Sequence, residues 1–201
     1  MEIDPLDSVE SGDDEAAAHA AHSRLNSRVA ITVALLATFM GVCKVKDDNI
    51  VQGMQQAQAD KIDHWSFYQA RNIRQDVAQS TVATLTVQRR AAAATDRTAI
   101  DSSIARFQAL AKDEATKKDS LRVQATEDQK TYDSLNFRDD QFDLSDTLIA
   151  LAISLLALTS LTKKEWLFWI AMVPTVLGAF MGLAGLAGWN VHPDAITRLL
   201  S

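Results

Sequence analysis

The chain has 201 residues and a formal net charge of −6, with 20 Lys and Arg against 26 Asp and Glu and a single cysteine. This charge balance argues against nucleic acid as a partner, because phosphate backbones are bound by clusters of basic residues. One cysteine excludes both an intramolecular disulfide and a metal site built from cysteines. The apolar residues make up 47% of the chain and are concentrated in three blocks, so we expect a protein of the lipid bilayer.

The N-terminal part combines a tail with a first span. Residues 1–15 are acidic and nearly free of large apolar side chains, which predicts a disordered tail. Residues 16–46 are predicted to be a helix that crosses the membrane along the uncharged run 29–43. That run is short, but Arg28 and Lys44 can extend their side chains to the two interfaces. A cleaved signal peptide is the weaker alternative, since the preceding segment is acidic and no Ala-x-Ala site follows.

The polar middle of the chain, residues 47–143, is predicted to be soluble and helical. It contains one glycine and no proline in 97 residues, a composition that favours helix over an all-β domain. We expect two long helices in an antiparallel, coiled-coil-like hairpin, each extending about 70 Å from the membrane at the helical rise per residue. The turn is expected near residue 95, where Thr95 and Asp96 are suitable helix N-caps.

Each predicted arm carries a weak stripe of small and apolar residues. The stripe of the first arm follows an 11-residue repeat through Ile62, Ser66, Ala70, Ile73, Val77, Thr81 and Thr84. The stripe of the second arm follows heptad steps through Ile100, Ile104, Phe107, Ala111, Glu114, Lys118, Leu121, Ala125, Asp128, Tyr132 and Leu135. Because few of these residues are large and apolar, a single helix would be marginally stable and partner helices are implied.

The C-terminal part, residues 144–191, is predicted to be a transmembrane helical hairpin. Its uncharged runs 147–162 and 166–191 are separated only by Lys163-Lys164-Glu165. A helix from residue 166 to residue 189 would rise about 35 Å, enough to cross a hydrocarbon core of about 30 Å. Tryptophans at both ends of this segment fit the aromatic belts of a membrane protein. Residues 192–201 are interpreted as a C-terminal tail.

Four glycines of the last span are candidate helix–helix contacts: Gly178, Gly182, Gly185 and Gly188. Small residues at such intervals let helix backbones approach closely, which is the usual basis of helix association in lipid. The partner helix could belong to the same chain or to a second copy, and the spacing leaves both possibilities open.

An aromatic segment stands out in the otherwise aromatic-poor middle of the chain. Trp65, Phe67 and Tyr68 lie within four residues, and Arg71 and Arg74 follow one turn further along the predicted helix. Tryptophan, tyrosine and arginine are common anchors of protein interfaces, so these side chains could dock a partner. The alternative, which we favour, is that they pack within the helical hairpin.

This segment also carries a family resemblance. Residues 65–74 read Trp-Ser-Phe-Tyr-Gln-Ala-Arg-Asn-Ile-Arg, and they follow a first span and precede a pair of C-terminal spans. The arrangement, from about residue 24 to residue 189, resembles an uncharacterised bacterial family of three-span membrane proteins that is catalogued only as a domain of unknown function. The resemblance implies a multi-pass protein of the bacterial cell membrane. It transfers no activity, catalytic residue or cofactor.

The titratable residues suggest no chemistry. His19 and His22 are spaced as i and i+3 beside acidic residues, and we interpret them as solvated rather than as metal ligands. Arg89, Arg90 and Arg97 are expected at a solvated tip of the hairpin. The spans contain no Asp, Glu, Lys, Arg or His, which argues against a coupled transporter or a proton relay. We therefore predict no catalytic residue, no metal and no cofactor.

The predicted fold is all-α, with three transmembrane helices and a long helical hairpin between the first two. The predicted function is that of a homo-oligomeric membrane scaffold or partner-binding protein without catalysis; an oligomeric channel or a transport-complex component is the alternative. Lysines in short loops are retained in the cytoplasm, so Lys163 and Lys164 predict a cytoplasmic N-terminus and a periplasmic location for residues 47–143. Lys44 and Lys46 argue for the opposite orientation.

Overall fold

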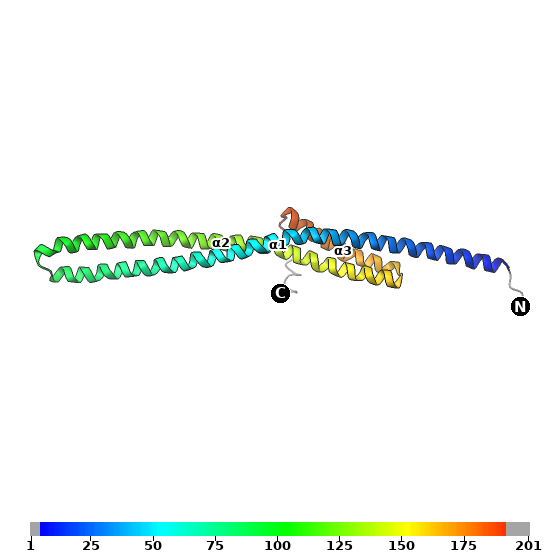
Figure 1. The fold of residues 1–201 in the computed structure, drawn as a ribbon, viewed down its shortest axis with the longest axis horizontal. Coiled ribbons are helices and arrows are strands. Elements are labelled where there is room, and N and C mark those ends of the chain that lie inside the picture. Colours follow the sequence, from blue (N-terminus) through cyan, green and yellow to red (C-terminus); the bar gives the residue numbers. More distant parts are fainter. Residues whose placement is uncertain (1–4, 192–201) are drawn as a thin grey trace. The chain divides into compact units, whose positions relative to one another are not determined.

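The computed structural model describes the backbone of residues 5–191 and the side chains of residues 20–191. This part of the chain consists of three α-helices, α1 (Pro5–Ala91), α2 (Ala94–Thr162) and α3 (Glu165–Ala187), without a strand (Figure 1). The chain divides into two units, which are described separately. Unit 1 comprises Met1–Val51 and Asn136–Ser201, and unit 2 comprises Gln52–Leu135.

The first two helices are long because their sequences contain little that would end them. Pro5 opens α1, where its missing N–H has no helical partner to lose, and no other proline occurs in α1 or α2. Helix therefore replaces the disordered tail predicted for residues 5–15, while residues 1–4 and the tail 192–201 lie outside the described residues. Acidic side chains near a helix N-terminus interact favourably with the helix dipole, and the alanines that follow favour helix.

In unit 2, α1 and α2 lie side by side and are joined by a short turn (Figure 1). α1 ends at Ala91 and α2 begins at Ala94, so the turn lies close to the predicted residue 95. The backbone N–H of Asp96 donates to the carbonyl of Ala93 at 3.1 Å, and Nε of Arg97 donates to the carbonyl of Ala92 at 3.2 Å. These two bonds use carbonyl groups that lie outside the helical ladder.

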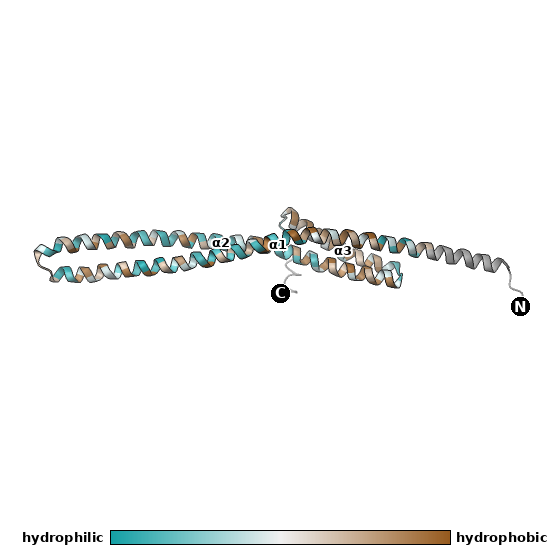
Figure 2. Cartoon of the chain, in the orientation of Figure 1, coloured by the Kyte–Doolittle hydropathy of each residue, from teal (hydrophilic) through white to brown (hydrophobic). Residues whose placement is uncertain are grey.

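Each of the three helices contains a segment long and apolar enough to cross a membrane, as expected for a multi-pass membrane protein. In unit 1 these segments pack around a core formed by Val29, Leu36, Ile149, Ala152, Leu156 and Ala171. Figure 2 shows the apolar residues concentrated in unit 1, whereas polar residues prevail along unit 2. Large side chains of unit 1 such as Leu35, Trp169 and Val173 remain exposed, as expected for a surface that faces lipid.

Candidate functional site

The buried face of α2 in unit 2 is the stripe that the sequence predicted. Ala111, Glu114 and Ala125 are 8%, 4% and 1% exposed, and the other members of that stripe are partly buried. The stripe includes three charged residues, and each of them faces a partner on α1.

The central pair joins Arg71 of α1 to Glu114 of α2. Nη1 of Arg71 donates to both carboxylate oxygens of Glu114 at 3.1 Å. The Glu114 side chain is 5% exposed, whereas that of Arg71 is 30% exposed and therefore keeps contact with water. A charge-assisted hydrogen bond of this kind satisfies a buried carboxylate that would otherwise be costly to remove from water.

Further polar contacts continue on both sides of this pair. Nδ1 of His64 lies 2.6 Å from Oδ2 of Asp128. Nζ of Lys118 donates to Oδ1 of Asn72 at 3.0 Å and stands 5.8 Å from the centre of the Tyr68 ring, within the range of a cation–π contact. With a hydrogen bond from Lys61 to Gln129, these contacts form what we call the polar seam, made of Lys61, His64, Arg71 and Asn72 of α1 and Glu114, Lys118, Asp128 and Gln129 of α2.

The stripe predicted for the first arm is wrong as a buried face. Ile62, Ile73 and Val77 are 55%, 62% and 59% exposed, whereas Ala57 and Ala78 on the opposite side of α1 are 6% and 1% exposed. Alanines let the helices approach closely, and the basic residues among them pair with the acidic residues of α2. A search for positive charge at heptad spacing opposite the second stripe would have identified this face from the sequence.

The structure divides the aromatic segment between two surfaces. Tyr68 is partly buried beside the polar seam, and the Trp65 ring meets it edge-on with the ring centroids 5.2 Å apart. Trp65 is nevertheless 37% exposed, so it lies at the edge of the contact and not between the helices. Phe67 is 59% exposed, and Arg74 is also exposed. Packing and exposure therefore both occur within this segment.

The glycines of α3 contact other helices of the same chain. A Cβ atom on Gly178 would lie 2.9 Å from the Ile149 side chain, and one on Gly182 would lie 2.7 Å from the ring of Phe39. Gly185 faces the ring of Phe142 at a similar distance. Of the two possibilities that the spacing left open, intramolecular packing accounts for these three glycines.

Gly188 has a different role, because it ends α3 in the left-handed conformation with a φ of 70°. Two polar side chains of α2 that the sequence analysis missed hold this end of the helix. Nη2 of Arg138 donates to the carbonyl of Gly185 at 3.0 Å, and Nε2 of Gln141 donates to the carbonyls of Trp189 and Val191 at 2.8 and 2.7 Å. Because the last carbonyls of a helix have no partner within it, these contacts satisfy groups that would otherwise need water.

A cluster of aspartates lies in unit 1 beside the predicted spans. Asp47 is 3% exposed, and its Oδ2 accepts a hydrogen bond from Nζ of Lys44 at 2.7 Å. Burial, a hydrogen bond to Asp47 and the nearby charges of Asp143 and Asp140 together raise the pKa of Asp139 to about 6. Burial and the charge of Asp47 also raise the pKa of Asp143. This cluster can therefore hold a proton that isolated aspartates would release.

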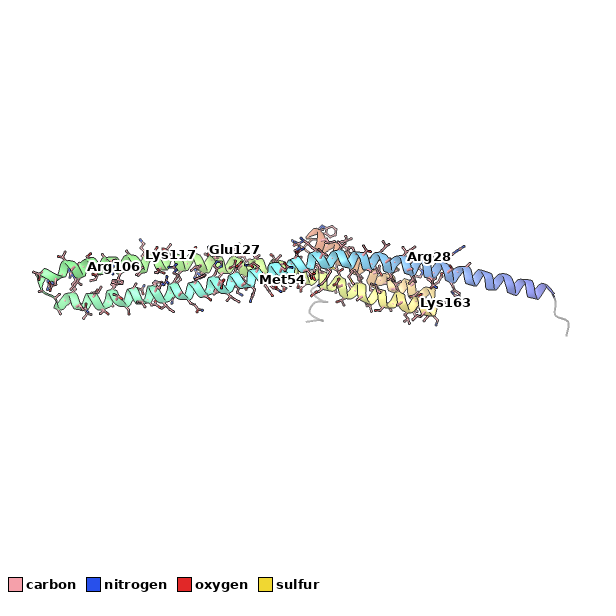
Figure 3. All side chains as sticks on the ribbon, viewed as in Figure 1. Arg28, Met54, Arg106, Lys117, Glu127 and Lys163 are labelled. Atoms are coloured by element: carbon pink, nitrogen blue, oxygen red, sulfur yellow. The ribbon has the colours of Figure 1, made fainter. Side chains whose placement is uncertain are left out.

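Several charged residues lie on the outer surfaces, among them Arg28, Arg106, Lys117, Glu127 and Lys163 (Figure 3). Lys117 pairs with Asp113 at 2.6 Å within α2, and Lys163 lies in the turn between α2 and α3. At the other turn, Arg89 forms an ion pair with Asp101. In the part of the chain with described side chains, no group of three or more His, Cys, Asp or Glu residues is placed to hold a metal ion. The side chain of His19 lies outside that part.

The sequence of the chain matches a known protein family. The family model described as "Domain of unknown function (DUF4337)" matches residues 25–188. The chain belongs to the DUF4337 family. The predicted resemblance to a family of unknown function is thereby confirmed. The DUF4337 region includes the polar seam, the aspartate cluster and the glycines of α3, whereas residues 1–24 lie outside it. No curated protein and no solved structure matches the chain.

Proposed function

We propose that this DUF4337 protein is a homo-oligomeric scaffold of the bacterial inner membrane without catalytic activity. In this proposal, residues 52–135 form an antiparallel helical hairpin that projects from the bilayer and contacts other protein chains. One observation carries the proposal. In unit 2 the facing sides of α1 and α2 pair with each other, while apolar side chains remain exposed on the outer surface.

The exposed apolar side chains of unit 2 are Ile62, Phe67, Ile73, Val77, Val87, Leu110 and Val123, in addition to the partly covered Trp65. Unit 1 can cover such residues with lipid, but a projecting hairpin meets water. Apolar residues that gather on a surface in water indicate a contact with protein. The polar seam supports the same function, because matched charges on two helices favour one register of the hairpin and give its outer surface a defined shape.

The oligomer can be tested directly by native mass spectrometry of the protein in mild detergent. We expect masses that correspond to two or more chains. A mass of one chain at every protein concentration, in detergent and in lipid nanodiscs, would overturn the scaffold proposal.

We further propose that the N-terminus lies in the cytoplasm and the helical hairpin in the periplasm, with Lys163 and Lys164 in a short cytoplasmic loop. Basic residues in short loops are retained on the cytoplasmic side. With three spans, a cytoplasmic N-terminus places the C-terminus in the periplasm. Alkaline phosphatase is active only there, so a fusion after the last residue should have phosphatase activity in bacteria. An inactive phosphatase fusion, together with a fluorescent green fluorescent protein fusion at the same position, would reverse the orientation.

A further inference from the structure

The side of α1 that points away from α2 in unit 2 carries a long surface with few charged residues, which we call the outer stripe. On a helix, its members lie within one third of the circumference, opposite the polar seam. The uncharged members are Ile62, Ser66, Gln69, Ala70, Ile73, Val77, Ser80, Thr81, Thr84 and Val87, and Asp63 lies at the border of the same sector. From its first to its last residue the outer stripe is roughly 37 Å long at the helical rise per residue.

The apolar members of the outer stripe are well exposed. Ile62, Ile73, Val77 and Val87 are 55%, 62%, 59% and 66% exposed, and they recur along the whole length of the stripe. A helix that faced only water would carry charged residues at such positions. The spacing of the outer stripe is that of a helix packed on both sides, and α2 occupies only one of them.

Three of the four hydroxyl groups of the outer stripe have a hydrogen-bond partner within α1. Oγ of Ser66 donates to the carbonyl of Ile62 at 2.9 Å, and Oγ1 of Thr81 donates to the carbonyl of Val77 at 2.8 Å. Thr84 donates in the same way, to the carbonyl of Ser80 at 3.0 Å. Because each of these donors already has a partner, a second helix could cover them without burying an unsatisfied hydroxyl.

The middle of the outer stripe is also hollowed. A shallow groove of about 450 Å³ is lined by Ile73, Asp76, Val77, Ser80, Thr81 and Thr84. Small side chains next to branched ones provide the alternation in which an apolar side chain of another helix can insert.

The membrane topology determines on which side of the bilayer a second copy presents the same surface. Both ends of unit 2 continue into helices of unit 1 that can cross a membrane, so unit 2 of every copy lies on the same side of one bilayer. In a parallel, in-register pair of α1 helices, each residue of the contact faces its own equivalent. A charged residue would then face a like charge, and the outer stripe contains one charged residue, Asp63, at its border.

We propose that the outer stripe binds the outer stripe of a second copy as a parallel, in-register helix pair. This inference rests on the proposed scaffold function and names the surface through which two copies associate. The small number of charged residues, the three partnered hydroxyls and the shared side of the membrane favour this occupant over a partner with a charged binding surface.

Cysteine cross-linking in native membranes tests the pair. Ile62→Cys and Val87→Cys lie at opposite ends of the outer stripe, so each should form a disulfide-linked dimer under mild oxidation only if the helices are parallel and in register. Val123→Cys is the matched control, since Val123 is 64% exposed on α2, close to the 66% of Val87. The parent chain, whose only cysteine is the buried Cys43, serves as the blank.

We expect a band at twice the mass of one chain for both stripe variants and little or none for Val123→Cys and the parent. Equal cross-linking of Val123→Cys would overturn the inference, as would a lack of cross-linking at both stripe positions. If native mass spectrometry still finds an oligomer in that case, the scaffold proposal stands and only this interface fails. If native mass spectrometry finds only monomers, both the scaffold proposal and this interface are wrong.

A charge-exchange experiment tests the register independently. Ile73→Glu alone and Ile73→Lys alone should each lose the dimer, because like charges then face each other across the pair. Co-expression of the two variants with different tags should restore a mixed dimer. Recovery of no mixed dimer, or loss of the dimer in the matched control Val123→Glu, would contradict a stripe-to-stripe contact.

Discussion

The geometry of the polar seam predicts that removing Arg71 destabilises unit 2 to a different extent than removing Glu114. Glu114 is 4% exposed and depends on Arg71 for the hydrogen bonds to both of its oxygens. The Arg71 side chain is 30% exposed, so it can turn toward water when its partner is removed. Arg71→Met should therefore destabilise unit 2 more than Glu114→Leu, although both substitutions break the same pair.

The expected sizes follow from these exposures. An uncompensated buried charge costs about 3–5 kcal/mol, and the partial access of this site to water places Arg71→Met near the lower end, at about 3 kcal/mol. Glu114→Leu should cost about 1 kcal/mol, close to the value of one ordinary hydrogen bond. The double variant, which places two apolar side chains opposite each other, should return to within about 1 kcal/mol of the parent.

Hydrogen exchange followed by mass spectrometry can measure these differences in the full-length protein in detergent, because it reports local opening of each helix. A loss of about 3 kcal/mol corresponds to roughly a hundredfold faster exchange in peptides that cover residues 65–80 and 108–120. Peptides from residues 27–36 of unit 1 provide an internal control. Equal acceleration by the two single variants, or a double variant as unstable as Arg71→Met, would refute this account of the seam.

Three further predictions concern other parts of the chain. Gly182→Leu would place side-chain atoms where an aromatic ring of α1 lies 2.7 Å from the Cβ position, and it should destabilise unit 1 by about 1–3 kcal/mol or more in SDS titration. Gly41→Leu, with no heavy atom within 4 Å of its Cβ position, should not destabilise it. Because the pKa of Asp139 is raised from its ordinary value of 3.8 to about 6, its contribution to stability is complete below the lower value and is lost as the pH rises through about 6. The melting temperature should fall over that interval, and Asp139→Asn should reduce the fall; an unchanged pH profile would contradict the proton-holding cluster. Trp65→Ala should cost about 1–2 kcal/mol, since the ring is partly exposed but stacks edge-on against its neighbour, whereas Phe67→Ala should be nearly neutral in thermal unfolding followed by circular dichroism.

Local patterns in the sequence were sufficient for the spans and for the helices beyond residue 15. Uncharged runs marked all three helices that can cross a membrane, although the first run is short, and the lack of proline and glycine predicted the long helices between them. The second stripe was also correct, because heptad spacing from Ile100 to Leu135 depends only on the geometry of one helix. In the sequence its charged members interrupt an otherwise apolar stripe, and their partners on α1 are known only from the structure.

The tertiary structure decided which side of each helix is covered. α1 has a side with few charged residues, which includes Ile62, Ile73 and Val77, and an opposite side with alanines and basic residues, and its own sequence favours the first as the buried one. Arg71 meets Glu114 across 43 residues of chain and His64 meets Asp128 across 64, so the pairing that buries the second side is not a local property. The same holds for the glycines of α3, whose spacing permits close approach but does not identify the neighbour. A helix specifies its own periodicity, whereas the choice between two possible faces depends on the side chains that the rest of the fold places against it.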